Sequence, residues 1–160
     1  MTSTLAKSAQ SVQDALQKHN LECTVMEFPI STRTAQEAAD AIGCTVTQIT
    51  KSLIFKTKET NQPVLVLASG SNRVNEKIIE SHVGHLILKA DADFAREVTG
   101  FAIGGIPPIG HQQKIDHIFI DKDLLNHKII WAAAGTPNAV FSIESKMLPI
   151  ITHGQVISLV

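Results

Sequence analysis

Short strand-like and helix-like segments alternate irregularly along this chain, and this alternation limits its fold more than any other feature. Val64 to Ala68 is a short apolar run of the kind that forms a buried strand, and similar runs follow later in the chain. Helical signals stand between some of these runs but not all of them. Hairpin-like pairs of strands therefore lie beside crossovers, which favours an α+β fold with a mixed sheet over a doubly wound parallel one.

Apolar periodicity and capping residues give the approximate positions of the elements. Leu5, Ala9, Val12 and Leu16 recur at helical spacing. Thr34-Ala35-Gln36-Glu37 is a capping-box pattern, and Gly43 ends the helix that it opens. We expect helices near 5–19, 34–43, 75–82 and 91–98, and strands near 53–56, 64–68, 85–88, 115–120, 128–133 and 139–143.

Composition predicts one folded domain over residues 1–160. Apolar residues make up 44% of the chain and charged residues 18%, and no repeat or Pro/Ser-rich linker divides it. The apolar runs are too short to cross a bilayer, and the first ten residues lack the apolar segment of a secretory signal. Cys23 and Cys44 lack CxxC spacing and are expected as reduced thiols. A cytoplasmic protein fits these features.

Net charge gives little support for a general nucleic-acid-binding surface. The chain carries −1 at pH 7, whereas such surfaces are strongly basic. Any contact with RNA must therefore come from a local patch. The segment 51–77 has five cationic residues against two acidic ones. A solvated face explains this excess about as well as an RNA contact does.

The segment 100–111 is the most unusual stretch of the chain. Four of the nine glycines and two of the six prolines fall between Gly100 and Gly110. Glycine allows a ligand to approach the backbone closely, and proline stiffens the chain between the glycines. The loop is suited to holding a small polar ligand through its backbone; the alternative is a tight structural connection. It is not a Walker loop, since no Gly-Lys-Ser/Thr follows.

Other candidate residues have no single interpretation by position alone. Lys51 enters an apolar strand, where a lysine either points into a cleft or reaches the surface. The run Ala132-Ala133-Ala134-Gly135 leaves room either for a substrate or for close packing of a helix. The seven histidines form no metal-ligand motif, and Ser69-Gly70-Ser71 lacks the elbow of a serine hydrolase. We expect neither a metal nor a cofactor.

Three motifs together, in this order, resemble those of one family. They are Lys51-Ser52-Leu53-x-Phe55, the segment from Gly104 to His111, and Ala132-Ala133-Ala134-Gly135-Thr136-Pro137. The chain resembles the YbaK-type aminoacyl-tRNA deacylases, which are related to the editing domain inserted in bacterial prolyl-tRNA synthetases. The resemblance extends from about residue 5 to the end of the chain. It implies a mixed, barrel-like sheet flanked by helices.

The resemblance also implies roles for single residues. Lys51 matches the lysine most often needed for activity, and Gly104 and Pro108 match the G-x-x-x-P loop that places the ester. Lys51 and Gly104 are therefore the expected catalytic residues. Thr34 is carried over from the family pocket, although an N-cap role would explain it fully. The expected substrate-binding residues are Thr34, Gly105, Ile106, Pro107, Pro108, His111 and Gly135.

The implied activity is hydrolysis of the ester of a mischarged tRNA, with prolyl-tRNA synthetase or elongation factor as a candidate partner and no membrane association. Family members acting on cysteine esters have an acidic residue a few positions after the glycine matched by Gly135. The segment 136–140 has none, which favours alanine, serine or threonine esters. Two alternatives remain open at this point: a non-catalytic module that binds tRNA or a synthetase, and hydrolysis of another small ester or amide.

Overall fold

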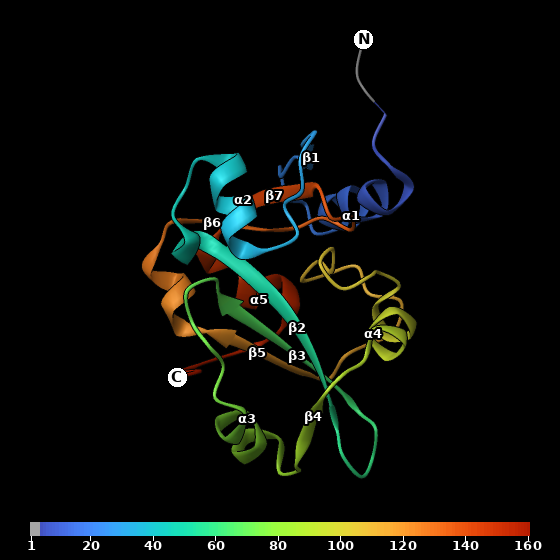
Figure 1. Ribbon diagram of the computed structural model, residues 1–160, viewed down its shortest axis with the longest axis vertical. Helices are drawn as coiled ribbons and strands as arrows, with labels where there is room; N and C mark the ends of the chain where they lie inside the picture. Colours follow the sequence, from blue (N-terminus) through green and yellow to red (C-terminus); the bar gives the residue numbers. More distant parts are fainter. Residues whose placement is uncertain (1–3) are drawn as a thin grey trace.

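One mixed sheet of eight strands organises residues 4–160, which this computed structural model describes (Figure 1). The strand order is β1-β7-β6-β2-β3-β5-β8, and β4 pairs with β2 beside this path. The strands are β1 (Met26–Glu27), β2 (Ile49–Thr57), β3 (Pro63–Ser69), β4 (Ile87–Lys89), β5 (His117–Asp121), β6 (Ile129–Ala133), β7 (Ala139–Glu144) and β8 (Gln155–Ile157).

The sheet contains both parallel and antiparallel pairs. β2 and β3 form an antiparallel hairpin in which Lys51 lies opposite Ala68, whereas β2 runs parallel to β6 and β3 runs parallel to β5. The predicted α+β fold with a mixed sheet flanked by helices is therefore confirmed. The likeness to a barrel is partial, because within the described residues β1 and β8 remain at opposite edges of an open sheet.

Capping residues fix the ends of the central helices. Thr34 accepts the Glu37 backbone N–H at the start of α2, and Gly43 ends this helix with φ +86°. Asn75 and Asp91 cap the next two helices in the same way. The helices are α1 (Lys7–Lys18), α2 (Ala35–Ile42), α3 (Glu76–Val83), α4 (Ala92–Thr99) and α5 (Leu148–Thr152), with 3₁₀ turns η1 (Val46–Gln48), η2 (Lys122–Asn126) and η3 (Ser145–Met147).

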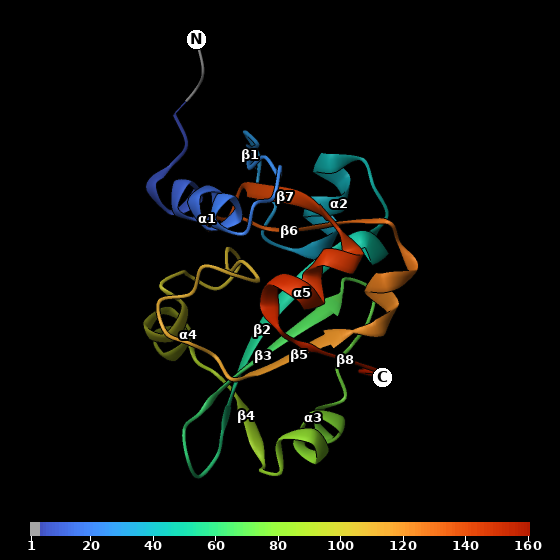
Figure 2. The ribbon, with the colours of Figure 1, turned by 180° about the vertical axis from the view of Figure 1, so that it is seen from behind.

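The β2–β3 hairpin is covered on both faces. Leu65 and Leu67 face a core that includes residues of α1, α4 and α5, while Val64 and Val66 face a second core that includes Ile79 of α3. This alternation follows from the twofold repeat of a strand and explains why 64–69 is buried throughout. Figure 2 shows α5 in front of the strands, and α3 near the lower end of the molecule.

The predicted helices and strands are confirmed, with shifted ends, and one further α-helix and two further strands appear. β2 extends beyond its predicted range of 53–56, because its first residues pair with β6. The additional elements are β1, α5 and β8, which have two, five and three residues and show no clear pattern in the sequence. Within residues 4–160, no helix has both the length and the apolar character that crossing a membrane requires.

Candidate functional site

The sheet is interrupted along one edge of β2. β6 pairs with β2 at Ile49 and Thr50, and β4 pairs with it from Phe55 to Thr57. Between these two contacts, no described strand covers this edge. Along β2, residues whose backbone groups point towards β3 alternate with residues whose backbone groups point the other way. Ile54 is of the second kind, because its carbonyl accepts the Ala90 N–H. Ser52 lies two residues before Ile54, so its backbone groups face the interruption.

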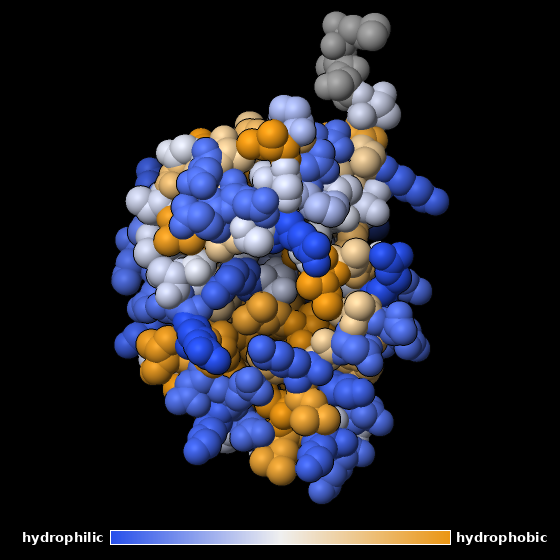
Figure 3. Space-filling view, in the orientation of Figure 1, coloured by the Kyte–Doolittle hydropathy of each residue, from blue (hydrophilic) through white to orange (hydrophobic). Residues whose placement is uncertain are grey.

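A cavity of about 360 Å³ opens at this interruption. Its apolar walls come from β2, from α4 and from the Gly/Pro loop, and charged side chains join them. Figure 3 shows a central hollow with apolar side chains inside and hydrophilic ones around it. The lining residues are Lys51, Leu53, Ile54, Phe55, Arg73, Val74, Glu76, Lys89, Ala90, Ala95, Ile103 and Ile106.

Lys51 brings a positive charge to the cavity wall. Its Nζ donates a hydrogen bond of 2.6 Å to the backbone carbonyl of Asn72. Burial lowers the pKa of Lys51 below the ordinary lysine value, and the negative charge of Asp121 opposes this effect. An ammonium has three N–H donors. The bond to Asn72 takes one of them, so the group retains donors for a ligand.

The Gly/Pro loop contributes two isoleucines to the lining of the cavity. Ile106 is buried and Ile103 is 46% exposed, and both line the cavity with Lys51. The Gly105 carbonyl accepts the Gly135 N–H at 2.8 Å, so the loop is tied to the segment after β6. A Cβ on Gly105 would lie 2.9 Å from the Thr136 nitrogen, too close for any side chain. Glycine at position 105 therefore allows the two segments to meet.

Gly104 allows a similar close approach by a side chain. It has φ +97°, and a Cβ there would lie 2.6 Å from Cγ of Arg33. Gly135 has φ +94°, and a Cβ on it would lie 2.6 Å from the carbonyl oxygen of Ser8. The expected residues from Gly104 to Ile106 and Gly135 thus belong to one closely packed assembly. Of these residues, Ile106 lines the cavity with Lys51, whereas Gly104, Gly105 and Gly135 do not line it.

The remaining expected residues lie away from this cavity. Pro107 and Pro108 are buried, and the Pro107 carbonyl is 2.7 Å from Nε2 of His111. Burial lowers the pKa of His111, while this hydrogen bond raises it to a smaller extent. Thr34 is exposed, and its hydroxyl caps α2. It does not line the cavity.

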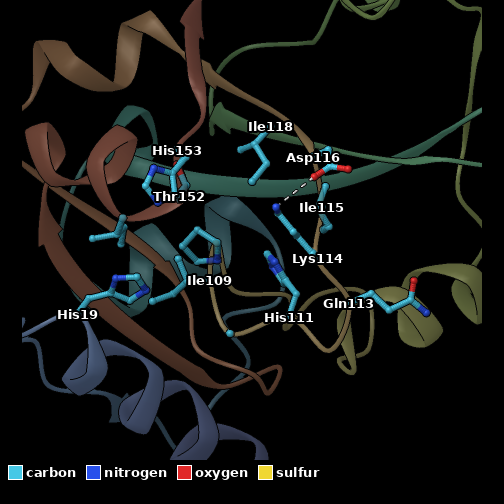
Figure 4. Close-up of a pocket in the computed structure, with 13 residues that line it drawn as sticks. His19, Ile109, His111, Gln113, Lys114, Ile115, Asp116, Ile118, Thr152 and His153 are labelled. Atoms are coloured by element: carbon cyan, nitrogen blue, oxygen red, sulfur yellow. Dashed lines mark ion pairs between the residues drawn. The ribbon is translucent and has the colours of Figure 1, made fainter.

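Pro108 and His111 line a second cavity of about 390 Å³. His19, at the end of α1, and His153, after α5, also line it (Figure 4). Lys114 reaches this cavity but is ion-paired with Asp116 at 3.8 Å. The Gly/Pro loop is therefore shared, with Ile103 and Ile106 lining one cavity and residues from Pro108 onward lining the other.

Three charged residues line the cavity that were not predicted from the sequence to do so: Arg73, Glu76 and Lys89. Arg73 was noted only as part of a basic segment, and Glu76 and Lys89 were given no role in the site. Lys89 reaches the cavity because β4 pairs with the far end of β2. No local pattern in the sequence predicts this pairing. Leu53 and Phe55 were within reach of prediction, since they follow Lys51 at the twofold spacing of a strand.

Metal-ligand groups and reactive thiols add nothing to this cavity. Across residues 4–160, no group of three or more His, Cys, Asp or Glu side chains is arranged to hold a metal ion. Cys23 and Cys44 are free and half-buried, and burial raises the pKa of each thiol. Neither cysteine lines the cavity of Lys51.

The chain is similar in sequence or in structure to several known proteins. The sequence is 29% identical to the uncharacterised protein YwhH of Bacillus subtilis (strain 168) over 141 residues, covering 88% of each chain. It is 34% identical over 86 residues to the proline–tRNA ligase of Limosilactobacillus fermentum, covering 51% of this chain and 15% of the ligase. A solved structure described as that of a proposed trans-editing enzyme for prolyl tRNA synthetase superposes with a TM-score of 0.91 and 43% identity, covering 98% of both chains.

The sequence model of the aminoacyl-tRNA editing domain matches residues 31–149, which make up most of the chain. This range includes β2 with Lys51, the whole Gly/Pro loop and the segment around Gly135. It therefore spans each wall of the cavity. The chain belongs to the aminoacyl-tRNA editing domain family.

Proposed function

We propose that this protein is a free-standing deacylase that hydrolyses the ester of a mischarged tRNA in trans. The observation that carries the proposal is that Lys51 and the Gly/Pro loop line one cavity of about 360 Å³. This volume is near the lower end of the range for small-ligand sites, about 300–1,000 Å³. It suits a small aminoacyl group together with part of the terminal adenosine.

The proposed chemistry needs no protein nucleophile. An aminoacyl ester is already activated, so positioning and charge stabilisation carry most of the catalysis. Water attacks the ester carbonyl, assisted by a hydroxyl of the terminal ribose. The backbone from Gly104 to Ile106 holds the ester, and the Lys51 ammonium stabilises either the developing oxyanion or the terminal phosphate. The released products are the free amino acid and the uncharged tRNA.

Arg73 and Lys89 extend the positive charge along the lining of the cavity. With Lys51 they make three cations against the single acidic residue Glu76. We assign these two side chains to the phosphates of the tRNA 3′ end. Because the whole chain carries −1, affinity for tRNA depends on this local group or on a partner such as prolyl-tRNA synthetase or elongation factor.

Small esters are the proposed substrates, and the apolar walls set the limit on size. Ile103, Ile106 and Leu53 line the cavity and would contact the amino acid side chain. Lost contacts alone discriminate one methylene by only about 1–3 kcal/mol, so strong selectivity requires a steric wall. Alanine, serine and threonine esters therefore rank ahead of larger ones, with tRNA-Pro as the proposed carrier because of the resemblance to prolyl-tRNA synthetase editing.

Replacement of Lys51 tests the proposal directly. Lys51→Ala should lower the deacylation rate about 100- to 1,000-fold, because removal of one charge-stabilising donor costs this much in comparable sites. Lys114→Ala is the matched control, since its side chain is 91% exposed and lies at the other cavity. A rate like that of the wild type in Lys51→Ala would remove this lysine from the mechanism.

A panel of tRNAs charged with Ala, Ser, Thr, Cys or Pro defines the substrate, with release of the amino acid followed over time. Fast release of one small amino acid, together with a requirement for intact tRNA, supports the proposal. Binding of charged tRNA without release would instead identify a non-catalytic module. Equal hydrolysis of a simple amino acid ester without tRNA would identify a general esterase.

A further inference from the structure

A chain of hydrogen-bonded groups supports the Lys51 side chain. It runs from the Lys51 ammonium to Asn72, and from Asn72 to the carboxylates of Asp121 and Asp123. Lys51 is on β2, Asn72 follows β3, and Asp121 ends β5. Three neighbouring parts of the fold thus converge behind one side chain of the site.

Asp121 is the buried end of this chain, with 1% of its surface exposed. Its Oδ2 accepts the Ser69 backbone N–H at 3.0 Å and the Asn72 side-chain amide at 2.8 Å. Its Oδ1 accepts the Asp123 backbone N–H at 3.0 Å. Within residues 4–160, neither recorded ion pair includes Asp121. The negative charge of Asp121 raises the pKa of the Lys51 ammonium.

Asn72 is held at both ends. Its side-chain nitrogen donates to Asp121 and to Asp123 at 2.8 Å each, which uses both amide hydrogens. Its backbone N–H donates to the Ser69 carbonyl at 2.9 Å. Its own carbonyl accepts Nζ of Lys51. The oxygen that receives the ammonium therefore belongs to a residue with little freedom to rotate.

We propose that Asp121, acting through Asn72, is a positioning residue for Lys51. It fixes the carbonyl to which Nζ donates, and it supplies the countercharge that keeps the ammonium at one point on the cavity wall. Hydrogen bonds that include a charged partner are stronger than neutral ones, which suits them to this task. The catalytic consequence rests on the proposed function, while the positioning itself is a property of the unliganded protein.

A purely structural role for Asp121 is the competing interpretation. The same carboxylate caps η2 and anchors the end of β3, so its loss must affect local stability in either case. The two interpretations differ in the effect that they predict on the pKa of Lys51 and on kcat. A structural role changes stability alone, whereas a positioning role also changes the titration of Lys51 and kcat.

Asp121→Asn is the main test variant, because it keeps the shape of the side chain and removes the charge. We expect the pKa of Lys51 to fall, since burial then acts without its opposing charge. Titration of lysine labelled with ¹³C at Cε, followed by NMR and assigned with Lys51→Arg, measures this directly. The other charged groups around Lys51 are Asp123, Arg73, Glu76 and Lys89, and they are unchanged in this variant.

The kinetic expectation is a fall in kcat of about 10- to 100-fold with KM little changed, because misplacing a catalytic group by about 1 Å has effects of this size. Asp116→Asn is the matched control, since it removes an exposed carboxylate near the start of β5 and should leave kcat and the Lys51 pKa unchanged. Asp121→Glu should not restore kcat, because the longer side chain displaces Asn72.

Asn72→Ala provides a second route if Asp121→Asn does not fold. It keeps the backbone carbonyl but frees it from both carboxylates, so kcat should fall while the charge of Asp121 remains. Unchanged kcat and an unchanged Lys51 pKa in a folded variant would overturn the positioning role, even if the wild type is an active deacylase. A wild type without deacylase activity would end the proposed function, and the NMR titration would still decide the positioning role.

Discussion

At the scale of single residues, the lysine of the site is under two opposing influences. Burial favours its neutral form, and the carboxylate of Asp121 favours the charged form. Burial is the larger effect, so the pKa of Lys51 lies below that of a lysine in water. The side chain therefore loses its proton at a lower pH than a lysine in water does.

The lowered pKa of Lys51 predicts how the deacylation rate changes at alkaline pH. If the cation is the active form, deacylation should fall as the pH rises through the lowered pKa of Lys51, below the ordinary lysine value of about 10.4. Single-turnover rates, corrected for spontaneous ester hydrolysis, measure the profile. Lys51→Arg should be slower but lack this fall, because a guanidinium stays charged. The same alkaline fall in the arginine variant would assign the titration to another group.

Gly104 and Arg33 give a second prediction for single residues. Gly104→Ala should destabilise the protein by about 1–3 kcal/mol, since the new methyl group meets the Arg33 side chain at a positive φ. Arg33→Ala removes Cγ and its contact. In a double-mutant cycle measured by denaturant unfolding, Gly104→Ala should therefore cost less in the Arg33→Ala background. Additive effects would show that the cost comes from the backbone alone.

At the scale of elements, the ends of the helices were predictable, whereas the pairing of distant strands was not. Thr34, Asn75 and Asp91 are caps that act within a few residues, so their signal is local. β1 and β8 have two and three residues, too few to show a strand repeat, and each exists because a distant strand pairs with it. Pro149, the second residue of α5, indicates a break as readily as a first helical turn.

The same distinction applies to the site. Lys51 and the Gly/Pro loop were identified through motifs of a known family, and their residue types alone left their roles open. Arg73 and Lys89 could not be placed, because their position at the cavity depends on tertiary pairing. The Lys51–Asn72–Asp121 chain joins residues up to 70 positions apart, and no spacing rule connects them.

The cap of α2 gives the prediction at this scale. Thr34→Ala should lower the free energy of unfolding by about 1 kcal/mol, because the Glu37 backbone N–H loses its acceptor. Thr24→Ala, at an exposed position outside the helices and strands, is the control and should have little effect. Denaturant unfolding measures both variants. A stability loss in Thr34→Ala no larger than in the control would show that the cap contributes nothing measurable.

At the scale of the whole molecule, His111 links the Gly/Pro loop to acid stability. Burial lowers its pKa in the folded state below about 6.5, so the unfolded chain binds a proton first as the pH falls. The free energy of unfolding should therefore decrease as the pH falls from about 6.5 to the lowered pKa, and then level off.

Denaturant unfolding at a series of pH values measures this dependence. His111→Gln should flatten the curve in this range, whereas His85→Gln, at an exposed position, should retain the shape seen in the wild type. An unaltered slope in His111→Gln would mean that other groups govern the acid response.

The interruption between β6 and β4 leaves part of the β2 edge available for hydrogen bonds to a bound ligand. If the proposed substrate enters there, it takes the place of a neighbouring strand, and its polar atoms can bond to the main-chain groups of β2 at the interruption. Hydrogen–deuterium exchange of the Ser52 amide should then be rapid in the free protein and slow once a non-hydrolysable aminoacyl analogue binds. A ligand bound in this way would pair with the free edge of β2 for as long as it stays in the cavity.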